Sequence, residues 1–268
     1  MSNIALQSAA SGLKALNTRL DVIANNLANA NTTGYKASRA NFQDLLYVER
    51  AQPGVENSNG DQRPTGLYVG LGVKVSGTQV QFGQGSPIAS DNPFDIMIEG
   101  EGFFQVSVDQ DLGGGVAYTR AGNFTLNAQG ELVLANAQGR RLEPNITLDD
   151  TVESVTIDRN GRIQISRPGQ VQVEEVGQIQ TATFINPAGL RQIGENLFIE
   201  SAASGPALIG EPGTENRGSV QQNMLEASNV DPTRELIELI RTQRSFELNS
   251  QSIRAADEAL QTIGQLRR

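Results

Sequence analysis

The sequence predicts an α+β protein, in which N- and C-terminal helices pair as a coiled-coil domain and bracket a central antiparallel all-β domain. Near the N-terminus, apolar residues recur at alternating steps of three and four, a spacing that predicts a helix with one narrow apolar stripe. A second stripe repeats every seven residues near the C-terminus, at Leu239, Phe246, Ile253 and Leu260. Between the stripes lie short alternating segments and turns. Helical ends around a β body favour a protein that assembles over one that catalyses.

Composition narrows the function classes. The chain has 268 residues, no Cys, no His and a net charge of −9. Without Cys there is no disulfide and no thiolate ligand or nucleophile, and without His the commonest metal ligand and acid–base group are missing. The acidic balance disfavours nucleic acid and anionic membranes as partners, and no segment is apolar enough to span a bilayer. We therefore expect no enzyme, no metal or other cofactor, no nucleic-acid partner and no direct lipid binding.

The first helix is expected from about Ser2 to about Asn31. It ends at Asn29–Gly34, where Asn and Gly favour a helix stop with positive φ. Its second half contains Asn25 and Asn26, which are poor helix formers. Two interpretations stay open: a frayed end, or Asn side chains that bond to neighbouring subunits. Because two arms paired only with each other bury little apolar surface against the entropy of ordering, we expect them to order fully against other copies.

Residues 35–92 read as an extended or β connector. The segment Asn41–Tyr47 continues a helix or enters a strand. A polar insertion is expected at about 47–66. Its segment Ala51–Pro64 has no periodicity and contains Pro and Gly, which predicts a long loop or extended excursion. Strands are expected at Leu67–Val75 and Thr78–Phe82.

Residues 93–228 are expected to form the antiparallel β domain. Alternating segments are separated by Gly-containing turns at Asn127–Gly130, Asn136–Gly139 and Asp158–Gly161, a spacing typical of a small antiparallel domain.

Two short motifs in this region have a structural explanation. Gly100-Glu-Gly102 lacks the third Gly and the following helix of a phosphate loop, and predicts a tight turn into a strand. Asp158-Arg-Asn-Gly161 lacks the remaining calcium ligands and predicts a hairpin turn. The carboxylate pairs at 149–150 and 174–175 are expected to be solvated surface charges.

The last helix has clear start signals. Asp231 is a capping carboxylate, Pro232 suits the first helical position, and Glu235 falls in the first turn. Residues 1–34 and 229–268 are therefore expected to form one helical assembly domain. Its interface residues are predicted from the two stripes: Leu6, Leu13, Leu16, Leu20, Ile23, Leu27, Leu236, Leu239, Phe246, Ile253 and Leu260.

Motifs along the chain resemble the flagellar rod/hook family of axial proteins. At the N-terminal end these are Ala10-Ser-Gly-Leu13 and Ile23–Lys36. At the C-terminal end they are Glu226–Asp231 and Glu235–Ser250. The body adds Ile98–Phe104, Tyr118–Phe124 and Phe184–Leu190. Within the family, the insertion after Tyr47 is similar to that of distal rod subunits, and the chain length leaves no room for the further outer domain of a hook subunit. The Asp231-Pro232 step departs from related sequences.

The resemblance implies a structural subunit of the flagellar distal rod that polymerises into a rigid hollow shaft and transmits torque from proximal rod to hook. It implies export through the flagellar type III channel without a cleaved signal peptide, and a location in the basal body from periplasm to outer membrane. Partners would be copies of the chain itself, proximal rod and hook proteins, and the peptidoglycan-ring and outer-membrane-ring proteins. The alternatives are a hook or proximal-rod subunit, and a soluble coiled-coil adaptor that forms closed particles.

Overall fold

The chain divides into two compact units in a computed structural model, which describes residues 2–55, 62–149, 152, 154–168 and 173–266. The helix side chains at 2, 3, 259, 260, 263, 264 and 266 lie outside this description. Unit 1 comprises the described residues of 1–28, 38–79 and 231–268, and unit 2 those of 29–37 and 80–230. The described fold is α+β, with an N-terminal helix, a central antiparallel β domain and a C-terminal helix.

The two terminal helices are α1 (Ser2–Ala28) and α2 (Pro232–Leu266). Helix α1 ends three residues before the expected Asn31, and the turns that follow include Gly34 with φ +70°. At the start of α2, one Asp231 carboxylate oxygen accepts the backbone N–H groups of Thr233 at 2.9 Å and Arg234 at 3.2 Å. The predicted cap and the predicted first position of Pro232 are therefore confirmed.

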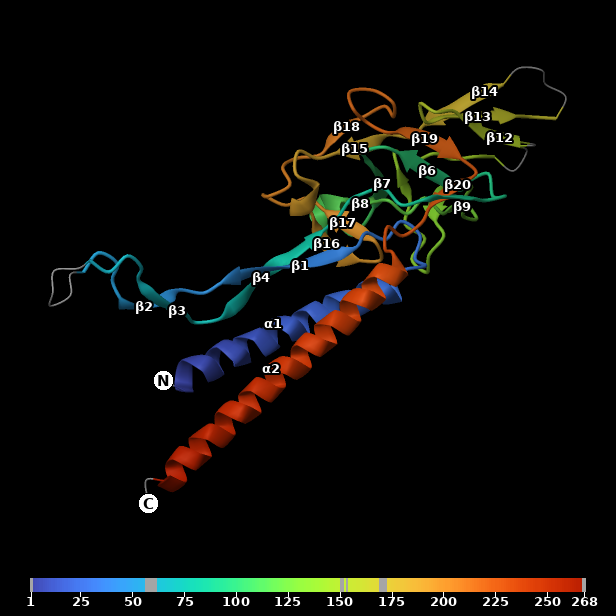
Figure 1. Cartoon of the computed structure of the whole chain (residues 1–268). Coiled ribbons are helices and arrows are strands. Elements are labelled where there is room, and N and C mark those ends of the chain that lie inside the picture. The colour runs from blue at the N-terminus through green and yellow to red at the C-terminus, as the bar shows by residue number, and fades with distance from the viewer. Residues whose placement is uncertain (1, 56–61, 150–151, 153, 169–172, 267–268) are drawn as a thin grey trace. The chain divides into compact units, whose positions relative to one another are not determined.

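The helices run antiparallel and are in extensive contact (Figure 1). Gly12 of α1 lies against Asn249 of α2, the Arg19 guanidinium donates to the Glu238 carboxylate at 2.5 Å, and the Asn26 amide donates to the Glu235 carboxylate at 3.3 Å. As positions rise along α1, their partners fall along α2, which fixes the antiparallel direction.

The segment between α1 and the β body forms a long two-stranded ribbon in unit 1 (Figure 1). Its strands are β1 (Ser38–Asp44), β2 (Tyr47–Ala51), β3 (Leu67–Gly70) and β4 (Val73–Val80), the last residue of which belongs to unit 2. Strand β1 pairs with β4, and β2 pairs antiparallel with β3. Bonds from Leu45 N to Gly72 O (2.8 Å) and from Leu71 N to Leu46 O (3.1 Å) join the two pairs.

Of the two structures expected for Asn41–Tyr47, the strand is the one that forms, and the insertion after Tyr47 begins as an extended strand. Residues 47–51 form a strand, and Asn41 lies in β1 and not in a helix. The residues of β2 do not alternate between apolar and polar, so the sequence did not indicate that they pair with β3. The centre of the insertion, residues 56–61, lies outside the described residues.

A glycine allows the ribbon to meet α1. Gly72 has φ +114°, and a Cβ at this position would clash with the hydroxyl of Ser11. That hydroxyl accepts the N–H of Val73 at 3.2 Å and donates to the carbonyl of Ser8 at 2.8 Å. Helix α1 thus contacts the ribbon as well as α2.

Unit 2 contains the β body. Its strands are β5 (Pro87–Ala89), β6 (Ile96–Glu99), β7 (Phe103–Ser107), β8 (Val116–Thr119), β9 (Phe124–Leu126), β10 (Leu132–Leu134), β11 (Leu142–Glu143), β12 (Ser154–Ile157), β13 (Arg162–Ser166), β14 (Glu174–Gln178), β15 (Thr181–Thr183), β16 (Arg191–Gly194), β17 (Leu197–Ile199), β18 (Leu208–Gly210), β19 (Ser219–Gln222) and β20 (Met224–Glu226). Short 3-10 helices lie at Gly113–Gly115 and Pro187–Gly189.

Among the described residues, the largest sheet has seven strands in the order β16-β17-β8-β7-β15-β18, with β11 also paired to β7. A three-stranded sheet, β12-β13-β14, and the pairs β9–β10, β6–β19 and β5–β20 complete the body. All these pairs are antiparallel, as predicted.

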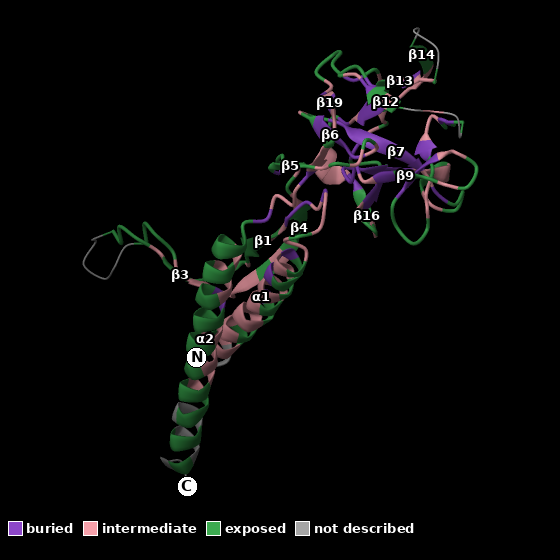
Figure 2. Ribbon diagram, turned by 90° about the vertical axis from the view of Figure 1, so that its right-hand side faces the viewer, coloured by how far each residue is buried: buried purple, intermediate pink, exposed green. Residues whose placement is uncertain are grey.

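The apolar core lies inside this body, as the buried colouring of Figure 2 shows. Phe104 is 0% exposed and meets Phe124 edge to face at 5.4 Å between ring centroids. In a second apolar cluster, the Phe103 ring meets the rings of Phe184 and Phe198 edge to face. The Phe184 ring also meets the Tyr118 ring edge to face. The Tyr118 hydroxyl donates to Glu200 at 2.6 Å, and burial together with this bond raises the tyrosine pKa.

We predict that Phe104→Ala destabilises the body by about 3–5 kcal/mol, because it leaves a cavity in a close-packed core. Urea unfolding monitored by circular dichroism measures the change. The control is Ile185→Ala, since Ile185 is 81% exposed and its truncation is expected to change stability by less than about 0.5 kcal/mol. Equal effects of the two substitutions would contradict the assigned core.

A second prediction concerns pH. Burial raises the pKa of Glu235 above its ordinary 4.5, more than the bond from Asn26 lowers it. A carboxyl with a raised folded-state pKa contributes stability that is present below pH 4.5 and is lost as the pH rises through the folded pKa. Wild-type stability minus that of Glu235→Gln should therefore fall with rising pH across that window. Thermal unfolding followed by helical circular dichroism tests this, with the exposed Glu247→Gln as control; a difference that rises instead is the contrary result.

Candidate assembly surfaces

Helix α2 has one face that is covered within the chain. The described positions that are not exposed recur at steps of three and four, which places them on one side of the helix. They are Glu235, Glu238, Leu239, Thr242, Phe246, Asn249, Ser250, Ile253 and Ala256. Since Glu235, Glu238 and Asn249 contact α1, we call this row the α1-facing row. It contains Leu239, Phe246 and Ile253 of the predicted interface, whereas the side chain of Leu260 lies outside the described part.

The predicted residues of α1 are covered to differing degrees. Ile23 is 5% exposed and buried, whereas five others are partly buried: Leu6, Leu13, Leu16, Leu20 and Leu27. The apolar stripe of α1 is therefore a side of the helix that is covered within this chain.

The heptad pattern missed two buried polar residues, one on the covered side of each helix. Asn26 is 2% exposed; its amide donates to the Ser38 carbonyl at 2.8 Å, and its oxygen accepts the Ser38 N–H at 2.9 Å. These bonds run within the chain, so for Asn26 the predicted bond to a neighbouring subunit is replaced by an intrachain one. Thr242, 2% exposed, donates to the Glu238 carbonyl at 2.7 Å. The available signal for Asn26 was its position three residues after Ile23, on the same side of the helix.

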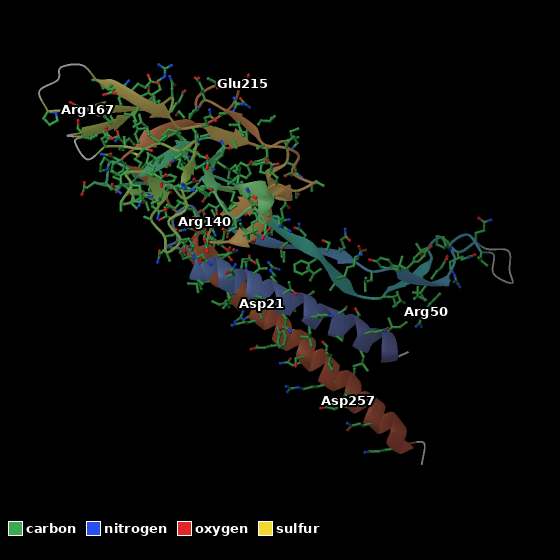
Figure 3. All side chains as sticks on the ribbon, turned by 180° about the vertical axis from the view of Figure 1, so that it is seen from behind. Asp21, Arg50, Arg140, Arg167, Glu215 and Asp257 are labelled. Carbon is green, nitrogen blue, oxygen red and sulfur yellow. The ribbon has the colours of Figure 1, made fainter. Side chains whose placement is uncertain are left out.

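The opposite side of α2 carries apolar residues that are in contact with water. We call this the outer face: Leu236 is 47% exposed, Ile237 47%, Ile240 54% and Leu248 64%. Figure 2 shows α2 exposed along much of its length, and in Figure 3 the labelled Asp21 and Asp257 mark exposed sides of the two helices. Leu236, predicted with the interface residues, lies here and not in the α1-facing row. Rows of exposed apolar residues are typical of interaction surfaces.

The ribbon carries a second exposed apolar surface, on β2 and β3 and the residue before β2. The apolar tip consists of Leu46 (82% exposed), Tyr47 (58%), Val48 (38%), Leu67 (56%) and Tyr68 (51%). Arg50, labelled in Figure 3, lies on the same strand pair.

Cross-strand contacts order this tip. The Tyr47 ring lies over Gly70, its partner across the ribbon. The Tyr47 hydroxyl donates to Asp44 at 3.1 Å, which raises the tyrosine pKa. Because an isolated two-stranded hairpin is marginally stable in water, a tip with this much exposed apolar surface favours a covering partner.

The motifs given structural explanations are turns, as predicted. Gly100 (φ +108°) and Gly102 (φ +138°) lead into β7. The Asp158 carboxylate accepts the N–H groups of Asn160 and Arg162 at the β12–β13 turn. Asp149 pairs with Arg167 at 3.2 Å at the surface; Asp150 lies outside the described residues.

In the described part of the chain, neither helix combines the length and the apolar character needed to cross a bilayer.

Three family models match this chain, at its two ends and within its body. The model "Flagella basal body rod protein" matches residues 6–36, "Flagellar hook protein FlgE/F/G D1 domain" matches residues 97–165, and "Flagellar basal body rod FlgEFG protein C-terminal" matches residues 221–266. The first and last of these cover most of α1 and α2.

Curated relatives are similar over nearly the whole chain. A "Flagellar basal-body rod protein FlgG" of Caulobacter vibrioides is 44% identical over 98% of this chain and 99% of its own length. Proteins of the same name from Agrobacterium fabrum and Borreliella burgdorferi are 41% identical, over 95% of both chains, and 40% identical, over 98% of both chains. With such identity over this length, and with the family's terminal segments folded here as helices around an antiparallel β body, the chain belongs to the flagellar basal-body rod protein FlgG family and is a structural rod subunit of the flagellum.

Proposed function

We propose that this chain forms the distal part of the flagellar rod, by polymerising with copies of itself into a rigid hollow shaft that transmits torque from proximal rod to hook. The observation that carries the proposal is the outer face of α2. Its apolar residues are exposed although the other side of the same helix is covered by α1. A helix with a second apolar row suits a multi-helix assembly, in which each α2 contacts its own α1 and a neighbouring copy.

In this proposal the helical ends, residues 1–34 and 229–268, act as the assembly domain and pair as a coiled coil, residues 35–92 connect them to the body, and residues 93–228 form the outer β layer. The α1 interface residues are Leu6, Leu13, Leu16, Leu20, Ile23 and Leu27. Those of α2 are Leu239, Phe246, Ile253 and Leu260 toward α1, and Leu236 toward a neighbour, to which the geometry adds Ile237, Ile240 and Leu248.

Location and further partners follow from family membership as proposals. The shaft would run from periplasm to outer membrane, join proximal rod and hook proteins, and turn inside the peptidoglycan and outer-membrane rings. The subunit would leave the cytoplasm by flagellar export.

Two other functions compete with this one. A hook or proximal-rod subunit would share the helical ends, but the insertion at about 47–66 favours the distal rod. A soluble coiled-coil adaptor would form closed particles of fixed size, whereas a rod subunit forms open tubes. Electron microscopy of the polymer formed by the purified chain separates open tubes from closed particles.

We predict that Ile240→Asp/Leu248→Asp prevents polymerisation. Losing the burial of two aliphatic side chains is worth about 4 kcal/mol, a ~1,000-fold rise in the concentration needed to polymerise. Sedimentation of polymer across a concentration series measures it. The control Ser252→Asp adds charge at an exposed position of the same helix that lies off the outer face, and should shift that concentration by less than about tenfold. If the double variant polymerised at the same concentration as the wild type, the outer face would not be part of the interface between copies.

A separate prediction concerns the ribbon tip. Leu46 and Leu71 are already joined by a backbone bond at 3.1 Å, so an Asn-Gly turn can replace residues 47–70 and close β1 onto β4. We expect the resulting rods to be more flexible or curved, because the tip would no longer bridge subunits. Persistence length measured from micrographs reports this. The control Leu46→Ser/Leu67→Ser keeps the backbone and tests the apolar contacts alone; straight rods of unchanged stiffness from the deletion would contradict the bridging role.

A further inference from the structure

Three segments that are distant in the sequence meet inside unit 2. They are residues 34–37, which follow α1; residues 81–86, which follow β4; and residues 226–229, which precede α2. Four side chains hold them: Lys36, Arg120, Glu226 and Asn229. We call these four the clasp. The first and third segments contain Lys36 and Glu226–Asn229 of the terminal motifs, for which assembly through the helices offers no role.

Glu226 is the centre of the clasp, and its side chain is 0% exposed. One carboxylate oxygen accepts the Lys36 ammonium at 2.5 Å and the Gly85 N–H at 2.8 Å. The other accepts the Arg120 guanidinium at 3.5 Å. Its backbone carbonyl accepts the Gly34 N–H at 2.8 Å. A single residue late in the chain therefore bonds to residues from three earlier segments.

Asn229 repeats this bridging with an uncharged side chain. Its oxygen accepts the Ala37 N–H at 2.7 Å, and its amide donates to the carbonyls of Gln81 at 2.8 Å and Gly83 at 3.0 Å. The Lys36 ammonium donates to the same Gly83 carbonyl at 2.9 Å. Peptide groups of the first two segments are thus satisfied by a residue from the third.

The charges of the clasp depend on Glu226. The side chain of Lys36 is 0% exposed and that of Arg120 4%. Burial lowers the pKa of both cations, and the charge of Glu226 opposes this, with Glu101 also acting on Arg120. Removing the anion would leave two buried cations without their shared partner, and an uncompensated buried charge is strongly destabilising.

The strand pairs of the body also join early segments of the chain to late ones. Strand β6, in the core, pairs with β19 (Figure 1). Strand β5 pairs with β20. Lys36 and Glu226 are 190 residues apart. The early strands of the body are therefore completed by residues that come almost last before α2.

We propose that the clasp delays closure of the β body until residues 226–229 are in place, so that the body folds only when nearly the whole chain is available. Before then, Lys36 and Arg120 would have to be buried without their counter-charge. The folding step itself concerns the isolated chain and is independent of polymerisation.

Pulsed hydrogen exchange during refolding of the full chain from urea tests the proposal. In the wild type, amides of β6, β7 and β8 should gain protection no earlier than those of residues 224–229. Protection of β6–β8 in an earlier phase would overturn the proposal, and this ordering decides it even if no variant folds.

The matched variants are Glu226→Gln, which keeps the shape and removes the charge, and Glu215→Gln at a side chain that is 80% exposed. We expect Glu226→Gln to slow the protection of β6–β8 at least tenfold and Glu215→Gln to leave it unchanged. A merely structural contact made after the rate-limiting step would accelerate unfolding and leave the folding rate unaltered. An unchanged folding rate in Glu226→Gln would therefore overturn the proposal.

Discussion

The body of this rod subunit depends on one buried carboxylate. Glu226 neutralises two buried cations and bonds to the backbone at Gly34 and Gly85. No apolar residue at this position would satisfy those groups, and the ammonium of Lys36 would have no anion within the described residues of the clasp. The aliphatic and aromatic core around Phe104 supplies burial energy, whereas the clasp joins segments that are distant in the sequence.

The two units differ in where they leave apolar surface exposed to water. Unit 2 buries a connected apolar core inside its sheets, although Ile185, Leu208 and Ile209 stay exposed. In unit 1, α1 is covered by α2 and contacts the ribbon, but α2 keeps an outer face with Leu248 64% exposed, and the ribbon carries the apolar tip. Since exposed apolar surface is costly in water, these two surfaces of unit 1 suit contacts with other copies. The family's structural role thus corresponds to a physical property of its helical ends.

Local patterns in the sequence predicted the local structure well. The Asp231-Pro232 start of α2, the turns at Asp158–Gly161 and Gly100–Gly102, and the covered stripe of α1 follow from capping, turn chemistry and periodicity. The pairing of β2 with β3 escaped prediction because the residues of β2 do not alternate. Asn26 was expected to fray or to bond to a neighbouring subunit, since periodicity alone does not identify the Ser38 backbone as its partner. The clasp could not be predicted: its partners are up to 190 residues apart, and no local rule links Lys36 with Glu226. Both residues lie in motifs that resemble those of the family, but the motifs do not indicate that the two side chains pair.

The central claim is that the outer face of α2 is covered by another copy in the assembled rod. Because the natural chain has no Cys, a single Leu248→Cys variant gives one reactive thiol on that face. Its maleimide labelling rate should be that of an exposed thiol in the unassembled chain and should fall sharply in the polymer. Thr242→Cys, on the α1-facing row, should be protected in both states. Equal labelling of Cys at position 248 before and after assembly would show that the outer face stays in water and would contradict the account.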